Sequence, residues 1–131
     1  MLKYKAFIIG CGKIAGLYDD LDDNQIYSHA RAYFENHKID LIGCYDSNFD
    51  RSSQLAEKFE TSSYDENYLE AFNIIKPDIV SICTPDVSHF EIVESILISS
   101  YVPKIIFLEK PACDNLAQFK TLINLSNLKS V

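Results

Sequence analysis

The sequence has 131 residues, of which 47% are hydrophobic, with a formal net charge of −7 and a mean hydropathy of −0.05. This length fits one domain that can bury its own core, and the negative charge argues against binding to a nucleic acid backbone. No apolar run approaches the roughly 18 residues of a membrane-spanning helix and no signal-peptide pattern follows Met1, so we expect a single cytoplasmic domain over residues 1–131, without membrane or nucleic acid partners.

Four short apolar runs have the pattern of buried parallel strands. They are nearly continuous and rich in β-branched residues, which is typical of strands that helices cover on both faces. A shorter strand is expected around residues 61–64. The four runs are residues 5–9 (KAFII), 39–45 (IDLIGCY), 78–83 (DIVSIC) and 104–108 (KIIFL).

Helical patterns alternate with these strands, and Asn48 or Ser47 is a suitable N-cap for one of them. This order predicts an α/β fold: a Rossmann-type doubly wound parallel sheet in a three-layer α/β/α arrangement. Ligands of such sheets bind beyond the carboxyl ends of the strands. The predicted helices cover residues 28–36, 49–59, 65–75, 89–99 and 115–128.

The first strand runs into a G-x-G-x-x-A motif at residues 10–15 (GCGKIA). Gly10 permits a tight turn, Gly12 lets the backbone approach a pyrophosphate, and Ala15 allows close contact between helix and strand. A helix that opens at Gly12 would offer free N–H groups to phosphates, although the motif could also be only a tight turn. The residues expected to bind a dinucleotide here are Gly10, Gly12, Lys13, Ile14 and Ala15.

Asp46 closes the second strand, where a carboxylate can accept hydrogen bonds from adenosine ribose hydroxyls. Because this carboxylate would repel a 2′-phosphate, NAD is favoured over NADP, while Arg51 keeps NADP possible. Asp46 could instead serve only as a helix cap. Its separation from the glycines exceeds the usual ~20 residues, and the excess is explained by an inserted loop at residues 18–27 (YDDLDDNQIY).

No metal site is expected. Asp20, Asp22 and Asn24 begin like an EF-hand loop, but Gln25 and Arg31 stand where that loop needs Gly and Glu. A solvated loop that swings away from an anionic cofactor is the better interpretation. The cysteines lack CxxC or zinc spacing and are expected to be small buried residues in a reducing compartment. They are Cys11, Cys44, Cys83 and Cys113.

The third long strand ends at Thr84 and Pro85, which begin the segment TPDVSH. If this strand neighbours the first one, the segment lies beside the glycine loop. His89, at the end of the segment, and His29, after the inserted loop, are candidate functional residues. Both could also be ordinary surface residues, and His37 is expected to be solvated.

The fourth strand ends in Glu109, Lys110 and Pro111, on the same predicted edge of the sheet. A lysine at this point can reach over a nicotinamide and exchange a proton with a substrate oxygen. Pro111 would fix the turn, and its peptide bond could be cis. An ordinary surface ion pair between Glu109 and Lys110 is the alternative.

Four stretches of sequence together resemble the glucose–fructose oxidoreductase, inositol dehydrogenase and rhizopine-catabolism family (Gfo/Idh/MocA). The more specific element is TP-xxx-H followed about twenty residues later by EKP. The resemblance covers essentially the whole chain but only the N-terminal half of the family's members. The stretches are IIGCGKIAG, YDSNFDRSSQLAEKF, DIVSICTPDVSHFEIV and FLEKPACDNLAQF.

The resemblance implies a role for each motif. The glycine loop would bind the cofactor pyrophosphate and Asp46 the adenosine ribose. Glu109 would contact the nicotinamide ribose, and Lys110, beside Pro111, would be the catalytic lysine. Asp86 stands where the family usually has Asn, and the inserted loop shifts His29 away from the position of the family's histidine after the glycine loop. The residues implied to line the nicotinamide side are Thr84, Pro85 and His89.

The family further implies an oxidoreductase that transfers a hydride between NAD(P) and a hydroxyl carbon of a sugar, sugar derivative or polyol. Its C-terminal α/β substrate domain, which supplies a catalytic Asp and His, is absent from this chain, so little turnover is expected from the chain alone. The complete protein would be a homo-oligomer. Two alternatives remain open: a non-catalytic nucleotide-binding sensor or subunit, and an S-adenosylmethionine-dependent methyltransferase-like domain.

Overall fold

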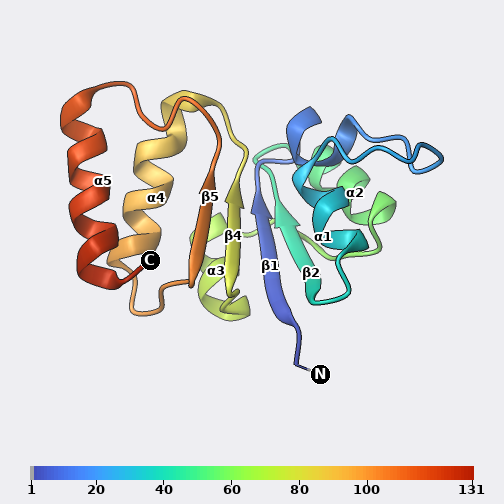
Figure 1. The fold of residues 1–131 in the computed structure, drawn as a ribbon, viewed down its shortest axis with the longest axis horizontal. Helices are drawn as coiled ribbons and strands as arrows, with labels where there is room; N and C mark the ends of the chain where they lie inside the picture. Colours follow the sequence, from blue (N-terminus) through green and yellow to red (C-terminus); the bar gives the residue numbers. More distant parts are fainter. Residues whose placement is uncertain (1) are drawn as a thin grey trace.

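A computed structural model describes residues 2–131 and contains one five-stranded, fully parallel sheet (Figure 1). The strand order is β3-β2-β1-β4-β5, so the chain builds one half of the sheet outward from β1 and then crosses to the other side of β1. The predicted Rossmann-type fold is confirmed. The strands are β1 (Tyr4–Ile9), β2 (Ile39–Tyr45), β3 (Ser63–Tyr64), β4 (Ile79–Ile82) and β5 (Ile105–Leu108).

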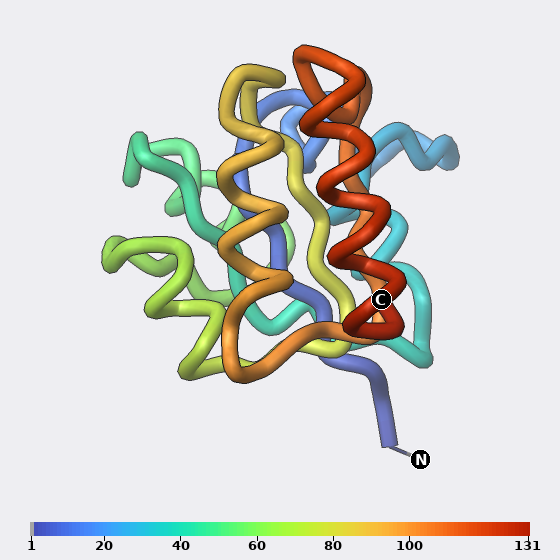
Figure 2. The backbone as a smooth tube through the Cα atoms, turned by 90° about the vertical axis from the view of Figure 1, so that its left-hand side faces the viewer, coloured from blue at the N-terminus to red at the C-terminus, as the bar shows by residue number. Residues whose placement is uncertain are grey.

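Helices form a layer on each face of the sheet. One layer holds the short η1, α1 and α2, and the other holds α3, α4 and α5 (Figure 1). In Figure 2, α4 and α5 run side by side in front of the sheet. The helices are η1 (Lys13–Leu17), α1 (His29–Glu35), α2 (Phe49–Lys58), α3 (Tyr68–Ile75), the 3-10 turn η2 (Asp86–Ser88), α4 (His89–Ile98) and α5 (Leu116–Lys129).

The central strand β1 connects the two cores through the alternation of its side chains. Ala6 and Ile8 face the helices α1 and α2, whereas Phe7 and Ile9 face α3 and α4. All four are fully buried. This explains why residues 6–9 (AFII) are apolar without a break: both faces of the strand are covered there.

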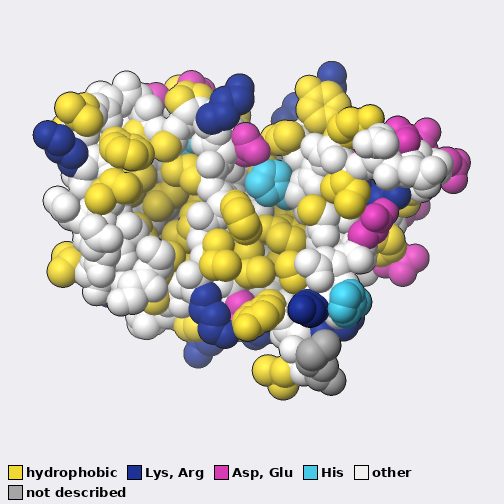
Figure 3. All heavy atoms as spheres, in the orientation of Figure 1, with side chains coloured by type: hydrophobic (Ala, Val, Ile, Leu, Met, Phe, Trp, Pro, Cys, Tyr) yellow, Lys and Arg dark blue, Asp and Glu magenta, His cyan; other side chains and the backbone are white. Residues whose placement is uncertain are grey.

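The outermost strand on one side, β5, is covered on one face only. Ile105 and Phe107 are 44% and 48% exposed, while their neighbours Ile106 and Leu108 pack into the α4 and α5 layer. Figure 3 shows hydrophobic side chains gathered at the middle of this open face. Within the described residues, no helix has the length and hydropathy to span a bilayer.

The inserted loop of residues 18–27 projects to the side of the molecule but is firmly anchored (Figure 1). The buried guanidinium of Arg31 donates to the backbone carbonyls of Asp20 and Asp23, at 3.2 and 3.0 Å. Asp19 is buried rather than solvated, because its carboxylate accepts the Tyr27 N–H and the Ser28 hydroxyl. The acidic side chains at 20, 22 and 23 are exposed, as predicted.

Asp78, just before β4, links the starts of three strands. One of its carboxylate oxygens accepts the Lys5 N–H at 2.9 Å and the other accepts the Lys104 ammonium at 2.7 Å. The hydrogen bond from Lys104 is the main reason that the pKa of Asp78 is lowered, followed by the hydrogen bond from Lys5. The carboxylate therefore stabilises the fold above its ordinary pKa, and this contribution is lost as the pH falls through the lowered value.

We expect Asp78→Asn to lower the thermal midpoint by about 3 °C at pH 7 and by less at an acidic pH below the lowered pKa of Asp78, where the native carboxylate is also protonated. Melting curves at the two pH values measure this difference. The control is Asp40→Asn, which breaks the exposed Lys3–Asp40 ion pair of 2.7 Å and should change neither midpoint. An equal decrease of the thermal midpoint for Asp78→Asn at both pH values would show that the charge of the Asp78 carboxylate is not what stabilises the fold.

Candidate cofactor site

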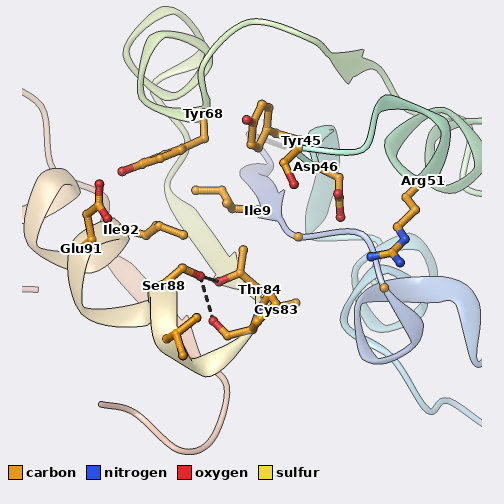
Figure 4. A pocket seen from close by; sticks show the side chains of 15 residues that line it. Ile9, Tyr45, Asp46, Arg51, Tyr68, Cys83, Thr84, Ser88, Glu91 and Ile92 are labelled. Carbon is orange, nitrogen blue, oxygen red and sulfur yellow. Dashed lines mark hydrogen bonds between the residues drawn. The ribbon is translucent and has the colours of Figure 1, made fainter. Parts of the chain in front are cut away.

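A cleft of about 640 Å³ lies at the carboxyl ends of β1, β2 and β4 (Figure 4). It sits where the strand order reverses, because β2 and β4 flank β1 on opposite sides. This is the place at which doubly wound sheets bind nucleotides. The motifs that end these three strands were predicted to meet here, and their residues Gly10, Gly12, Asp46, Thr84 and Pro85 all line the cleft.

The glycine turn is held against both neighbouring strands. The Gly10 N–H donates to the Tyr45 carbonyl at 2.7 Å, and Gly10 has a φ of +89°. A Cβ at Gly12 would have no heavy atom within 4 Å, so this glycine borders open space in the cleft. Lys13 and Ile14 begin η1 with exposed side chains, whereas Ala15 is fully buried.

η1 is a single turn of π-helix, in which the N–H groups of Gly16 and Leu17 both reach the Gly12 carbonyl. The first long helix of this half of the sheet begins only at His29, with Ser28 as its N-cap. The glycine motif is therefore followed by one turn and the inserted loop rather than by a long helix.

Asp46 connects the glycine turn to the end of β2. Its Oδ2 accepts the Cys11 N–H at 2.7 Å, and its Oδ1 accepts the Asn48 N–H at 2.8 Å. The N-cap of α2 is Asn48, one of the two predicted candidates. Figure 4 shows Asp46 and Arg51 on the same side of the cleft. A carboxylate oxygen has two acceptor positions, so both oxygens of Asp46 can still accept a ligand hydroxyl.

The opposite wall comes from the loop after β4 and from α3 and α4. The Ser88 hydroxyl lies 2.8 Å from both Thr84 Oγ1 and the Pro85 carbonyl, which fixes the loop (Figure 4). Tyr68 and Glu91 extend toward each other across this end of the cleft. Glu91 lies within the stretch DIVSICTPDVSHFEIV, but the sequence gave neither Glu91 nor Tyr68 a role in the site.

His89 does not line the cleft. It is 1% exposed, and its ring nitrogens lie 2.8 Å from the carbonyl oxygens of Thr84 and Pro111. This placement differs from the expectation that His89 faces a nicotinamide. Its ring instead joins the loop after β4 to the loop after β5, so both loops keep a fixed relative position.

The segment after β5 lies on the same edge of the sheet. The Lys110–Pro111 peptide bond is cis, as the sequence suggested, and Lys110 is exposed. Glu109 is paired with His29 rather than with Lys110: its Oε1 lies 2.8 Å from His29 Nε2. This hydrogen bond is the main reason that the pKa of Glu109 is lowered, so its carboxylate stays charged.

The cysteines are free thiols, and three of them are buried as predicted. Contact with Cys44 and burial raise the pKa of Cys11 far above its usual range, and burial raises that of Cys83 to about 12. These thiols are therefore protonated and unreactive near neutral pH. Within residues 2–131, no group of three His, Cys, Asp or Glu side chains is placed to hold a metal ion.

The fold brings His29 against Glu109, outside the lining of the cleft, together with two residues that the sequence did not single out, Ser81 and Tyr33. Ser81 stands inside an apolar strand and Tyr33 on the apolar face of a helix, so the pattern around each residue indicated a core position and not a functional one. A buried serine in the middle of a strand is the one available signal, because a buried hydroxyl needs a partner.

Comparisons with known proteins agree with this geometry. Residues 4–131 match the model of the Gfo/Idh/MocA family, described as an oxidoreductase family with an NAD-binding Rossmann fold. D-glucoside 3-dehydrogenase from Escherichia coli (strain K12) is 30% identical over 84 residues, which are 64% of this chain and 21% of that protein.

Two solved structures share the fold. The NAD complex of a protein of gentamicin A biosynthesis has a TM-score of 0.82 and 18% identity, covering 100% of this chain and 33% of that one. A 3-ketoreductase from Actinomadura kijaniata in complex with NADP has a TM-score of 0.79 and 19% identity, covering 97% and 36%.

The chain thus spans about a third of the length of these solved relatives, at 33% and 36%, and 21% of the curated one. The match to the family model is nevertheless nearly complete over the chain itself, and it falls on the Rossmann sheet and the cleft described above. NAD is confirmed as the cofactor of this kind of domain. The chain belongs to the Gfo/Idh/MocA family of oxidoreductases, which bind NAD on a Rossmann fold.

Proposed function

We propose that residues 1–131 form the dinucleotide-binding domain of an oxidoreductase that transfers a hydride between a nicotinamide and a hydroxyl carbon of a sugar, sugar derivative or polyol. The observation that carries this proposal is the cleft at which the glycine turn, Asp46 and the loop after β4 meet. The similarity to a D-glucoside 3-dehydrogenase supports the substrate class. A substrate domain and a homo-oligomeric assembly belong to the complete protein in this proposal.

The residues of the cleft fit a dinucleotide. The open space beside Gly12 admits a pyrophosphate, since a side chain there would fill it. Lys13, Ile14 and Ala15 present the backbone N–H groups of the turn that follows. Asp46 accepts hydrogen bonds from the adenosine ribose, which favours NAD over NADP, and Arg51 is the residue that could accept a 2′-phosphate.

The nicotinamide end of the cofactor belongs beside the loops that end β4 and β5. Thr84 and Pro85 line the cleft, and His89 holds their loop against Pro111. Glu109 accepts a hydrogen bond from the nicotinamide ribose with its charged carboxylate. The bound nicotinamide supplies the acceptor or donor of the hydride.

Lys110 is the catalytic residue of the proposal. Its side chain is exposed at the rim, and the adjoining peptide bond to Pro111 is cis. In carbonyl reduction its ammonium donates a proton to the substrate oxygen as the hydride reaches the carbon. In alcohol oxidation its amine takes the hydroxyl proton as the hydride leaves. Atoms and charge balance in both directions, and no metal is required.

Titration calorimetry of the chain with NADH, NADPH and S-adenosylmethionine tests the cofactor assignment. We expect measurable heat with NADH at up to millimolar concentration, weaker binding of NADPH, and no binding of S-adenosylmethionine. Binding of S-adenosylmethionine in preference to NADH would replace the proposal with a methyltransferase-like function. The absence of heat with both nicotinamide cofactors would contradict the proposal that this domain binds a dinucleotide.

A further inference from the structure

Four side chains form one continuous hydrogen-bonded row that ends at Glu109. Tyr33 Oη lies 2.6 Å from Ser81 Oγ, Ser81 Oγ lies 2.9 Å from His29 Nδ1, and His29 Nε2 lies 2.8 Å from Glu109 Oε1. His29 and Tyr33 are one turn apart on α1 and therefore share a face of that helix. Ser81 lies at the centre of β4, and Glu109 directly follows β5.

The inner end of this row is shielded from water. Ser81 is completely buried and Tyr33 is 5% exposed, so their hydroxyl groups need partners inside the protein. The His29 and Phe107 rings also form a T-shaped contact, with 6.3 Å between ring centres. The ring is thus held by Ser81 on one nitrogen, Glu109 on the other, and an aromatic side chain beside it.

The proton positions follow from the two ends of the row. At one end the carboxylate of Glu109 is charged and can only accept, so His29 Nε2 carries the proton between them. At the other end, burial raises the pKa of Tyr33 to about 12, so its phenol keeps a proton to donate to Ser81.

Ser81 then has its own hydroxyl proton left for His29 Nδ1, which must be the bare nitrogen of the ring. Every group donates once and in the same direction, from Tyr33 to Glu109. A proton on Nδ1 would leave one hydroxyl proton of the row without an acceptor: that of Ser81 if its oxygen accepted from both neighbours, or that of Tyr33 if Ser81 turned toward it.

We propose that His29 is a positioning residue of the cofactor site, held by Ser81 and Tyr33 so that its Nε2–H fixes the carboxylate of Glu109. Glu109 Oε1 accepts this bond, and Oε2, which receives only a weak 3.4 Å contact from the Lys110 N–H, is the freer oxygen to accept a ligand hydroxyl. The inference rests on the proposed function only in one respect: it takes that hydroxyl to belong to the nicotinamide ribose.

Two measurements test this role, and the first needs no cofactor. Long-range proton–nitrogen spectra of the ¹⁵N-labelled chain at pH 7.5 report which ring nitrogen is protonated, with the His29 signals assigned by their loss in His29→Gln. We expect a proton on Nε2 and none on Nδ1. A proton on Nδ1 would overturn the inference whether or not the chain binds a nicotinamide cofactor.

The second measurement is the NADH dissociation constant of matched variants whose melting curves are native-like. We expect His29→Leu to weaken binding about tenfold, as for loss of one hydrogen bond to a charged group, and Ser81→Ala and Tyr33→Phe to weaken it about two- to fivefold. His29→Gln, whose amide can still donate to Glu109, should stay within about twofold of the wild type. The exposed His37 provides the control His37→Leu, which should change nothing.

The outcomes separate the two proposals. If the wild-type chain binds NADH and His29→Leu binds it equally well, the positioning role is wrong while the proposed function stands. If the wild-type chain does not bind NADH, the proposed function fails, and the protonated nitrogen alone decides whether the row is arranged as described. Equal losses in His29→Gln and His29→Leu would mean that the ring acts through packing rather than through its Nε2–H.

Discussion

Gly10→Ala is expected to destabilise the protein by about 3 kcal/mol or more, a large part of the stability of a domain of this size. The native φ of +89° is strained for any residue with a side chain. In addition, the new Cβ would lie 2.6 Å from the Thr84 nitrogen and 2.7 Å from the Cys83 carbonyl carbon. Because these are backbone atoms at the end of β4, they cannot move aside without separating β4 from β1.

Urea unfolding measures this loss, and Gly12→Ala is the matched control. Gly12 has a φ of −83°, and a Cβ added to it would meet no heavy atom within 4 Å, so its replacement should cost less than about 1 kcal/mol of stability. The same change places a methyl group in the space proposed for the pyrophosphate, and NADH binding should weaken at least about tenfold. Gly10→Ala with wild-type stability would show that the turn can open without strain.

The contrast between these two glycines marks what the sequence could and could not predict. The motif indicated a turn and a phosphate site, since a G-x-G spacing after a strand has few other uses. It did not indicate that Gly10 touches the backbone of a strand about seventy residues later, because that contact depends on β4 lying next to β1. From the sequence, the adjacency of these two strands was a condition and not a prediction.

The histidines also show that contacts between residues far apart in the sequence could not be predicted. His89 was expected on the nicotinamide side because of its TP-xxx-H motif, whereas His29 was a candidate without an assigned role. The fold buries His89 between two carbonyl groups, whereas it places His29 between a buried serine and a carboxylate. Hydrogen-bond partners far apart in the sequence decide what each ring can do, and periodicity does not report them.

The inserted loop shows that composition can mislead about a single residue. Four aspartates in five positions predicted a solvated segment, which is correct for three of them. Asp19 is buried because the Tyr27 N–H and the Ser28 hydroxyl close the loop onto its carboxylate. Arg31 and Lys58 then hold the loop through backbone carbonyls, that of Asp19 in the case of Lys58, and this kind of contact leaves no charge pattern in the sequence.

Asp46→Ala is expected to shift the preference between NAD and NADP by about 100-fold, since it removes the repulsion between two like charges in one cleft. In the native chain the carboxylate would face the 2′-phosphate of NADP, which carries about −1.5 to −2 charge. Its removal leaves Arg51, which lines the same cleft, free to pair with that phosphate.

The absolute affinities should move in opposite directions. NAD binding should weaken about tenfold, because the ribose hydroxyls lose their acceptor and the Cys11 N–H loses the 2.7 Å bond that supports the glycine turn. NADP binding should become tighter. Titration calorimetry with the two oxidised cofactors measures both constants under identical ionic strength, which matters because the phosphate contact is screened by salt.

Two controls locate the effect at the carboxylate of Asp46. Asp50→Ala removes the same charge from the first turn of α2, but Asp50 does not line the cleft, so the ratio of affinities should stay within about threefold of the wild type. Adding Arg51→Gln to Asp46→Ala should cancel the gain in NADP binding, because the neutral amide cannot form an ion pair with the phosphate. An unchanged ratio in Asp46→Ala would place the adenosine ribose elsewhere, and a gain that survives Arg51→Gln would show that another group receives the phosphate.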